Sequence, residues 1–173
     1  MELNQQLHNL RHSASHLLAQ AVLELFPDTK VTIGPVTDTG FFYDFLPTKN
    51  FKEEDLTLIE NKMKEIAKRG YKILGKQVTK AQALELFKEN QFKVELINGI
   101  QDASVGVYSQ GDFFDLCKGG HVDSVDQIKY FKLTSISGAY WRADRNGIAL
   151  QRISGVAFLT QRELDEYFQR LKF

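Results

Sequence analysis

The sequence predicts an α+β fold in which helices pack against a largely antiparallel sheet. Two observations predict it: helical apolar periodicity occurs in separate stretches along the chain, and short apolar runs at hairpin spacing lie between them. No internal repeat, low-complexity tract or linker divides the 173 residues. This length suits one domain, residues 1–173, with a real hydrophobic core.

The first predicted helix covers Gln5 to Phe26. One apolar stripe at about 100° per residue runs along it, formed by Leu7, Leu10, Ala14, Leu17, Leu18, Ala21 and Leu25. On this helical wheel His12 and His16 point away from the stripe, and their neighbours are Ala19 and Leu23 rather than charged residues. We therefore expect this second face to be half covered by another part of the chain.

The remaining elements follow from caps, periodicity and turn residues. Three further helices are predicted: Glu53 to Arg69 with Gly70 as its cap, one beginning at the Thr79/Gln82 capping box, and one beginning at Thr160/Glu163 and continuing to Phe173. Strands are predicted as a pair within 31–46 and at 92–96, 105–108, 113–116, 130–136 and 148–153. In the strand at 92–96, Lys93 would point outward into solvent.

Composition excludes several classes of protein. Twenty-two basic residues balance 22 acidic ones, which argues against non-specific polyanion binding but leaves room for a local basic face. Cys117 is the only cysteine, so no intramolecular disulfide can form. No apolar run approaches the roughly 20 residues of a membrane span, and the polar start is unlike a signal peptide. We expect a cytoplasmic protein without membrane partners.

The reactive side chains gather in two short segments. His12 and His16 form H-x-x-x-H on the first helix, where residues four apart stand one above the other. Cys117 and His121 form C-x-x-x-H in a turn that contains glycines. Together these four side chains would make a tetrahedral zinc set. The alternatives are ordinary helix histidines and a cysteine that serves as a small hydrophobic residue; His8, one turn earlier, is interpreted as structural.

Other candidates depend on their surroundings. Asp115 would share a strand face with Cys117 and either orient a histidine, hold a substrate amine or cap a turn. Tyr43, in an aromatic strand, is either a core residue or a catalytic group. A basic cluster close to Trp141 is a candidate for contacting a nucleotide end by charge and stacking; it comprises Arg142, Arg145 and Arg152.

Several motifs in order resemble one family. The segments RHSASHLLAQAV, IGPVTDTGFFYDF, DLCKGGHVDSVDQIKYFKLTSISGAYWRAD and LQRISGVAF are similar to the editing domain of threonyl-tRNA synthetases, the threonyl/alanyl second additional domain. The resemblance covers essentially the whole chain and implies the α+β fold of that domain. It also implies hydrolysis of seryl-tRNA(Thr), with the acceptor end of tRNA(Thr) carrying serine as the partner.

The resemblance also implies roles for individual residues. His12 would activate water or relay a proton through the ribose hydroxyl, while His16 and His121 would position water and substrate. The pocket would be completed by Cys117 and by three flanking residues: Asp115 binding the α-amino group, Lys93 stabilising the oxyanion, and Tyr43.

Metal dependence and context stay open at this stage. Related alanyl-type domains bind zinc with this four-residue set, whereas the threonyl type is usually described as metal-free. The resemblance therefore implies that no cofactor is required. Zinc bound by His12, His16, Cys117 and His121 is the alternative. Where the family pattern D-x-C-R-G-P-H has Arg and Pro, this chain has Lys118 and Gly120, which predicts a looser turn.

No aminoacylation segment occurs, so the chain alone should not activate threonine. This favours an excised part of a synthetase, with the remainder as partner, over a free-standing editor. A tRNA-binding module without catalysis is the other reading.

Overall fold

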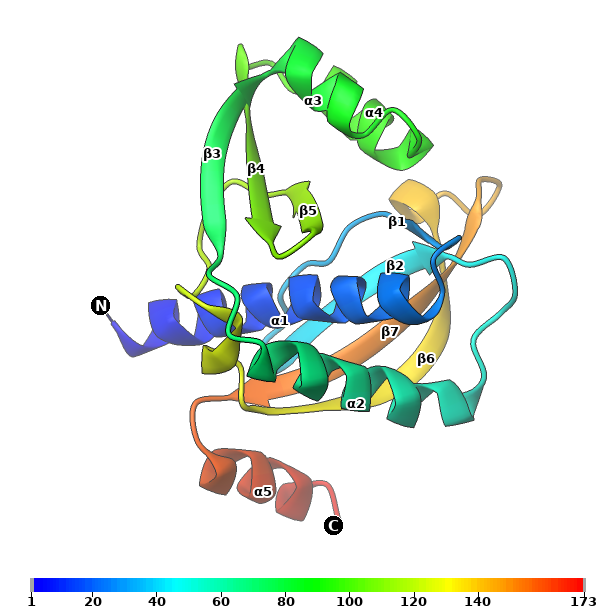
Figure 1. Cartoon of the computed structure of the whole chain (residues 1–173). Coiled ribbons are helices and arrows are strands. Elements are labelled where there is room, and N and C mark those ends of the chain that lie inside the picture. The colour runs from blue at the N-terminus through cyan, green and yellow to red at the C-terminus, as the bar shows by residue number, and fades with distance from the viewer. Residues whose placement is uncertain (1, 173) are drawn as a thin grey trace.

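The computed structural model describes residues 2–172, and within them two antiparallel sheets are combined with five α-helices (Figure 1). The α+β prediction is therefore confirmed. The helices are α1 (Leu3–Leu25), α2 (Glu53–Lys68), α3 (Lys80–Leu86), α4 (Gln91–Asn98) and α5 (Gln161–Arg170). The main sheet, in the order β1-β2-β7-β6, comprises β1 (Lys30–Val31), β2 (Gly40–Leu46), β7 (Ala149–Phe158) and β6 (Tyr130–Tyr140). The smaller sheet comprises β3 (Leu74–Thr79), β4 (Ser104–Gln110) and β5 (Phe113–Leu116).

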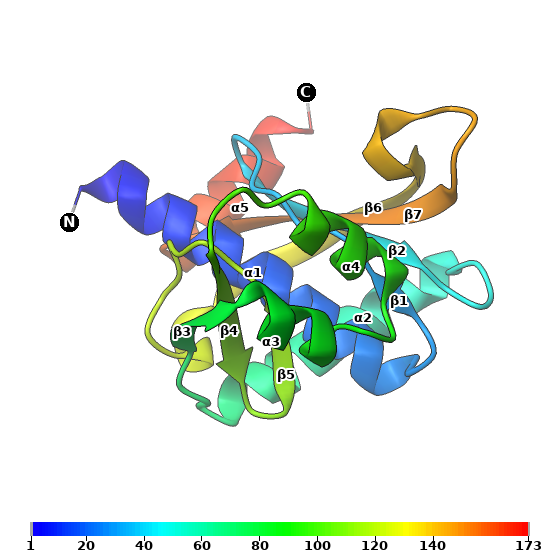
Figure 2. The same cartoon turned by 90° about the horizontal axis from the view of Figure 1, so that it is seen from above.

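Helix α1 lies between the two sheets and is covered on both sides (Figures 1 and 2). Its apolar stripe packs against β2 and β7, where Leu17 and Phe41 belong to the largest core cluster. Its opposite face meets the smaller sheet, and the amide of Gln20 pairs with that of Gln110 on β4 at 2.8 Å. The expectation of a second covered face is confirmed, and this face carries His12 and His16.

Helix α2 covers the same face of the main sheet as α1 and extends the core. Ile59, Met63 and Ile66 are fully buried there. At the end of β7, helix α5 packs on Phe158 through Leu164. The two flanking helices fix the main sheet as a rigid support for α1, since interiors packed at this density deform little.

Helix α4 replaces the strand predicted at 92–96, and that prediction is wrong. The Asn90 side chain accepts hydrogen bonds from the amides of Phe92 and Lys93, at 3.0 and 3.2 Å, and so begins a helix. Phe92 and Leu96 are four residues apart, as are Lys93 and Ile97, so each pair shares a helix face. The five residues 92–96 fit both the strand period of 2 and the helix period of 3.6. The preceding Asn90, a residue that favours helix N-caps, was the signal that distinguishes the two.

Smaller differences concern element ends. Strand β3 was not predicted, because five of its six residues are exposed and it shows no apolar alternation. Strand β6 continues to Tyr140 and β7 to Phe158, so the hairpin is longer than expected. Helix α5 ends at Arg170, and residue 173 lies outside the described part of the chain. Among the described residues, no helix has the length and apolar character needed to span a membrane.

Two glycines on strands of the main sheet provide a matched test of its packing. A Cβ on Gly40 would lie 1.9 Å from the Gly155 carbonyl oxygen and 2.6 Å from Val156 Cα, whereas one on Gly138 would meet nothing within 4 Å. We expect Gly40→Ala to lower the free energy of unfolding by about 1–3 kcal/mol. Gly138→Ala should raise it by up to about 1 kcal/mol. Urea denaturation measures both, and equal midpoints would contradict this packing.

Candidate active site

Two histidines of α1 face each other on successive turns. The Nε2 atoms of His12 and His16 are 3.2 Å apart. The Nδ1 atom of His12 lies 2.9 Å from the Gly120 carbonyl oxygen, and that of His16 lies 3.1 Å from Asp115 Oδ2. Because both oxygens accept hydrogen bonds, each ring carries a proton on Nδ1. The two Nε2 atoms are thereby left to act in the site.

Cys117 joins this histidine pair. Its Sγ lies 3.6 Å from His12 Nε2, and the ligand atoms of Cys117, His12 and His16 all lie within 4.8 Å of one another. Burial acts to raise the pKa of the Cys117 thiol, but hydrogen bonds and charge from His12 and His16 outweigh it and lower this pKa to about 6. The sulfur is therefore a thiolate at neutral pH.

The carboxylate of Asp115 is the centre of a buried network. Its Oδ2 accepts from Tyr43 Oη at 2.7 Å and from His16 Nδ1 at 3.1 Å. Its Oδ1 lies 2.5 Å from Lys93 Nζ and accepts from the Leu116 amide at 2.8 Å. Asp115 and Lys93 are each 2% exposed and Tyr43 is 1% exposed. All acceptor positions of the carboxylate are occupied by donors of the protein.

The network fixes the charges of its members. Burial acts to lower the pKa of His16, but hydrogen bonds to Asp115 and Cys117 and their charges raise it to about 9. Burial acts to raise the pKa of Asp115, while the Lys93 charge and His16 hold it well below its usual range. Burial and the neighbouring Asp115 raise the pKa of Tyr43 well above its usual value. At neutral pH the chain of charges is ammonium, carboxylate, imidazolium and thiolate.

Lys93 reaches this network from the unexpected helix α4. Besides Asp115, its ammonium donates to the Thr32 carbonyl oxygen at 2.6 Å and to Tyr43 Oη at 3.1 Å. The expectation that Lys93 points into solvent is therefore wrong, while its inclusion among the pocket residues agrees with its position. The Thr32 carbonyl is a partner that side-chain motifs could not reveal, because it is a backbone atom.

His121 lies beside the trio of His12, His16 and Cys117 without joining it. Its Nδ1 atom is 2.9 Å from the Val122 carbonyl oxygen, and its ring packs edge-on against Tyr108, with centroids 3.9 Å apart. Within residues 2–172, only the trio brings three potential metal-ligand atoms of this kind together. The predicted four-residue set is thus reduced to three residues in this arrangement, and His121 borders a small buried space with His16.

The turn from Cys117 to His121 is shaped by its glycines. Gly119 and Gly120 have φ angles of 125° and 81°, in the left-handed region that glycine favours. The Gly120 carbonyl oxygen holds His12, and Ser13 Oγ accepts the Val122 amide at 2.9 Å. The turn is therefore anchored to α1 at two points, although the sequence predicted a loose turn. Ser13 was missed because a lone helix serine carries no signal.

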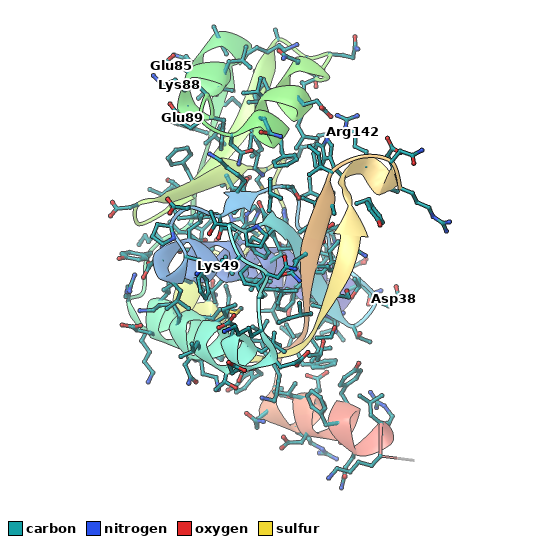
Figure 3. The ribbon with its side chains drawn as sticks, turned by 90° about the vertical axis from the view of Figure 1, so that its right-hand side faces the viewer. Asp38, Lys49, Glu85, Lys88, Glu89 and Arg142 are labelled. Atoms are coloured by element: carbon teal, nitrogen blue, oxygen red, sulfur yellow. The ribbon has the colours of Figure 1, made fainter. Side chains whose placement is uncertain are left out.

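The three candidate arginines lie apart from the trio. Arg152 on β7 makes a two-bond ion pair with Asp44, at 2.9 and 3.1 Å. Arg142, at the tip of the β6–β7 hairpin (Figure 3), pairs with Glu95 at 2.6 Å. Arg145 is exposed at the same tip. Two of the three guanidinium groups are thus engaged by carboxylates.

A cleft gives access to the trio. It has a volume of about 710 Å³, and His12 and Cys117 lie on its wall together with Gln77, Leu96 and Lys118. The wall combines apolar side chains with polar ones, as is usual for small-molecule sites. A water molecule or a small polar substrate group in the cleft can therefore contact His12 and Cys117.

Comparison with known proteins identifies similar sequences. Residues 105–154 match the model of the "Threonyl and Alanyl tRNA synthetase second additional domain". Relatives named threonine--tRNA ligase include those of Rubrobacter xylanophilus, 49% identical over 96% of this chain, and of Citrifermentans bemidjiense, 53% identical over 94%. The relative from Francisella philomiragia is 51% identical over 94%. The chain spans 26% of the length of each of these relatives.

The geometry predicts an acidic thiol. We expect the ultraviolet absorbance of the Cys117 thiolate to titrate with a midpoint at about 6, since two imidazoles stabilise the ionised sulfur. His12→Asn should move the midpoint upward, toward the usual value of about 8.5. His8→Asn, one turn away on α1, is the matched control and should leave it in place. A midpoint near the usual value in the unaltered protein would refute the assigned charges.

Proposed function

We propose that this chain, which belongs to the threonyl and alanyl tRNA synthetase second additional domain family, hydrolyses the ester of seryl-tRNA(Thr). The observation that carries the proposal is the trio of His12, His16 and Cys117 at an open cleft. Similarity to a segment of threonine--tRNA ligases supports a role in translation and an interaction with tRNA. The remainder of such a ligase is then its partner in a longer protein, and aminoacylation belongs to that remainder.

The substrate follows from a limit on discrimination. Serine lacks one methyl group of threonine, and one methyl group gives a binding pocket only about 10- to 200-fold selectivity. A ligase for threonine therefore benefits from a second site that hydrolyses the smaller product. The proposed reaction is attack of water on the ester carbonyl carbon, cleavage of its bond to the ribose oxygen, and release of serine and tRNA.

His12 is the proposed general base. Its Nδ1 proton is held by the Gly120 carbonyl oxygen, so the position that can accept a proton is Nε2, 3.6 Å from Cys117 Sγ. When His12 acts as the base its Nε2 carries no proton, so the ionised Cys117 then accepts only the Nε2 proton of His16, and His12 Nε2 is open to water. His12 would take a proton from the attacking water and return it to the leaving ribose oxygen, so that protons balance over the cycle.

Asp115, Lys93 and Tyr43 are proposed as positioning residues. Each is at least 98% buried in the described structure, and Asp115 already has four donors. The earlier expectations, that Asp115 binds the substrate amine and Lys93 the oxyanion, would require these groups to leave their partners. We assign them instead to holding His16 charged and oriented. His121 is retained as a neighbour that positions substrate, and Arg145 as the candidate for tRNA contact.

A zinc-dependent hydrolase is the second candidate, and the donor set supports it. Zinc with nitrogen ligands at about 2.0–2.1 Å and sulfur at about 2.3 Å would place two nitrogens about 3.3 Å apart and nitrogen and sulfur about 3.6 Å apart in tetrahedral geometry. The corresponding distances are 3.2 Å and 3.6 Å. His12, His16 and Cys117 would hold the ion, which would supply a bound water of lowered pKa. Gly120 and Asp115 already orient the two rings as ligands require.

Deacylation tests the proposed function. Purified chain should release serine from seryl-tRNA(Thr) well above the background rate and should leave threonyl-tRNA(Thr) largely intact. His12→Ala should lower kcat by about 10²- to 10⁴-fold through loss of the base. His8→Ala, on the same face of α1, should retain activity. Hydrolysis at the background rate by correctly folded chain would leave only a tRNA-binding role.

Metal content separates the two candidates. For the metal-free reaction, elemental analysis should find well under one zinc per chain, and chelation should leave the deacylation rate unchanged. For the zinc reaction, one equivalent should co-purify, and Cys117→Ser should release it, because thiolate is the strongest donor of the trio. Activity lost on chelation and restored by added zinc would reverse our preference for the metal-free reaction.

A further inference from the structure

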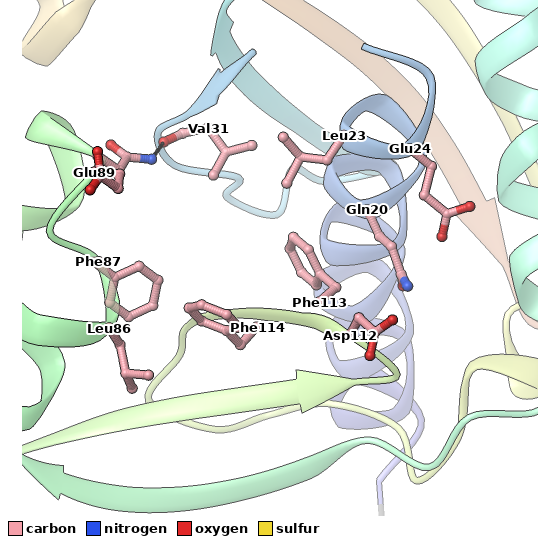
Figure 4. A pocket seen from close by; sticks show the side chains of 11 residues that line it. Gln20, Leu23, Glu24, Val31, Leu86, Phe87, Glu89, Asp112, Phe113 and Phe114 are labelled. Carbon is pink, nitrogen blue, oxygen red and sulfur yellow. Dashed lines mark hydrogen bonds between the residues drawn. The ribbon is translucent and has the colours of Figure 1, made fainter. Parts of the chain in front are cut away.

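A second cavity lies behind the candidate active site. It has a volume of about 470 Å³ and is enclosed by the C-terminal half of α1, strand β1, the segment joining α3 to α4, and the start of β5 (Figure 4). Its apolar wall consists of Leu23, Val31, Leu86, Phe87, Phe113 and Phe114. This volume lies within the range of small-molecule sites, about 300–1,000 Å³.

The aromatic wall is only partly covered by the protein itself. Phe87 and Phe114 pack edge to face with centroids 5.3 Å apart, and Phe114 is 39% exposed. Leu86 beside them is 43% exposed. Large apolar side chains gathered in one concave patch, rather than scattered over the surface, are typical of ligand-binding grooves.

The charged residues that line this cavity are all acidic, and Lys30 at its edge donates from Nζ to the Glu89 carbonyl oxygen at 2.6 Å. Glu24, Glu89 and Asp112 line the cavity, and none of its lining residues is basic. Glu24 is neutralised by a two-bond ion pair with Arg69, at 2.7 and 2.9 Å. Within residues 2–172, the carboxylates of Glu89 and Asp112 make no hydrogen bond or ion pair, and Figure 4 shows them on opposite sides of the cavity. The cavity therefore combines an aromatic wall with two free negative charges.

We propose that this cavity binds a small aromatic ammonium ligand, with its ring on the phenylalanines and its cation beside one of the two carboxylates, Glu89 or Asp112. Charge complementarity selects a cation over an anion, and phenylalanine faces add cation–π attraction. The cavity and the candidate active site are formed by the same elements: Phe113 precedes Asp115 by two residues on β5, and Asn90 caps the helix that carries Lys93. The assignment concerns binding and stands independently of the proposed hydrolysis.

Tryptamine and indole-3-propionate are matched probes, because they share a ring system and differ in the sign of their charge. Calorimetric titration at low salt should give a dissociation constant for tryptamine at least tenfold below that for indole-3-propionate. Amide chemical shifts should change around Phe87, Asn90 and Phe114. Equal affinities for the two probes, absence of binding at millimolar concentration, or shift changes confined to other parts of the chain would overturn the proposal.

Variants test the charges separately from the wall. The double variant Glu89→Gln/Asp112→Asn should weaken tryptamine binding about tenfold and leave the neutral probe 3-ethylindole unaffected. Glu85→Gln is the matched control, since Glu85 pairs with Lys88 and does not line the cavity. Unchanged tryptamine affinity in the double variant would overturn the role of the carboxylates. Loss of binding in a longer protein that contains this chain would assign the groove to a neighbouring segment instead.

Discussion

The packing of the two sheets and the geometry of the candidate active site both depend on the hydrogen bonds and ion pairs of the buried Asp115 carboxylate. It lies on β5 of the smaller sheet and is bonded to side chains from α1, from β2 of the main sheet and from α4. These are His16, Tyr43 and Lys93, and each is at least 91% buried. Removing one member of such a buried pair costs about 3–5 kcal/mol, because the remaining charge loses its partner. Closure of the smaller sheet onto α1 therefore also orients the His16 ring.

Alternation of charge explains how so many ionised groups are tolerated inside the protein. Lys93, Asp115, His16 and Cys117 follow one another as plus, minus, plus and minus, so that each charge is next to its opposite. Backbone oxygens complete the arrangement: Thr32 accepts from Lys93, and Gly120 accepts from His12. In a low-dielectric interior such pairing recovers the cost of desolvation, whereas any single member alone would become neutral.

Elements defined by contacts between residues close in the sequence could be predicted, whereas those defined by contacts between distant residues could not. The period of α1, and with it the covered second face, could be predicted because a long helix repeats its pattern over several turns. The pairing of H-x-x-x-H with the Cys117 turn could be predicted from residue types alone. The position of Lys93 could not, because a five-residue alternation does not distinguish strand from helix. Strand β3 was missed because its stability comes from pairing with β4 rather than from burial of its own side chains.

The choice between water and zinc depends on the gap between the two imidazoles. Two lone pairs 3.2 Å apart repel each other, so at least one of the two Nε2 atoms must carry a proton or a metal. In the charged network His16 carries this proton on Nε2 and donates it to Cys117, and the His16 pKa of about 9 keeps the proton bound at neutral pH. A metal would have to displace that proton at a cost of about 3 kcal/mol at pH 7. The ion pair with Asp115 that orients the ring for a metal thus also retains the competing proton, so metal affinity at this site should fall as the pH falls.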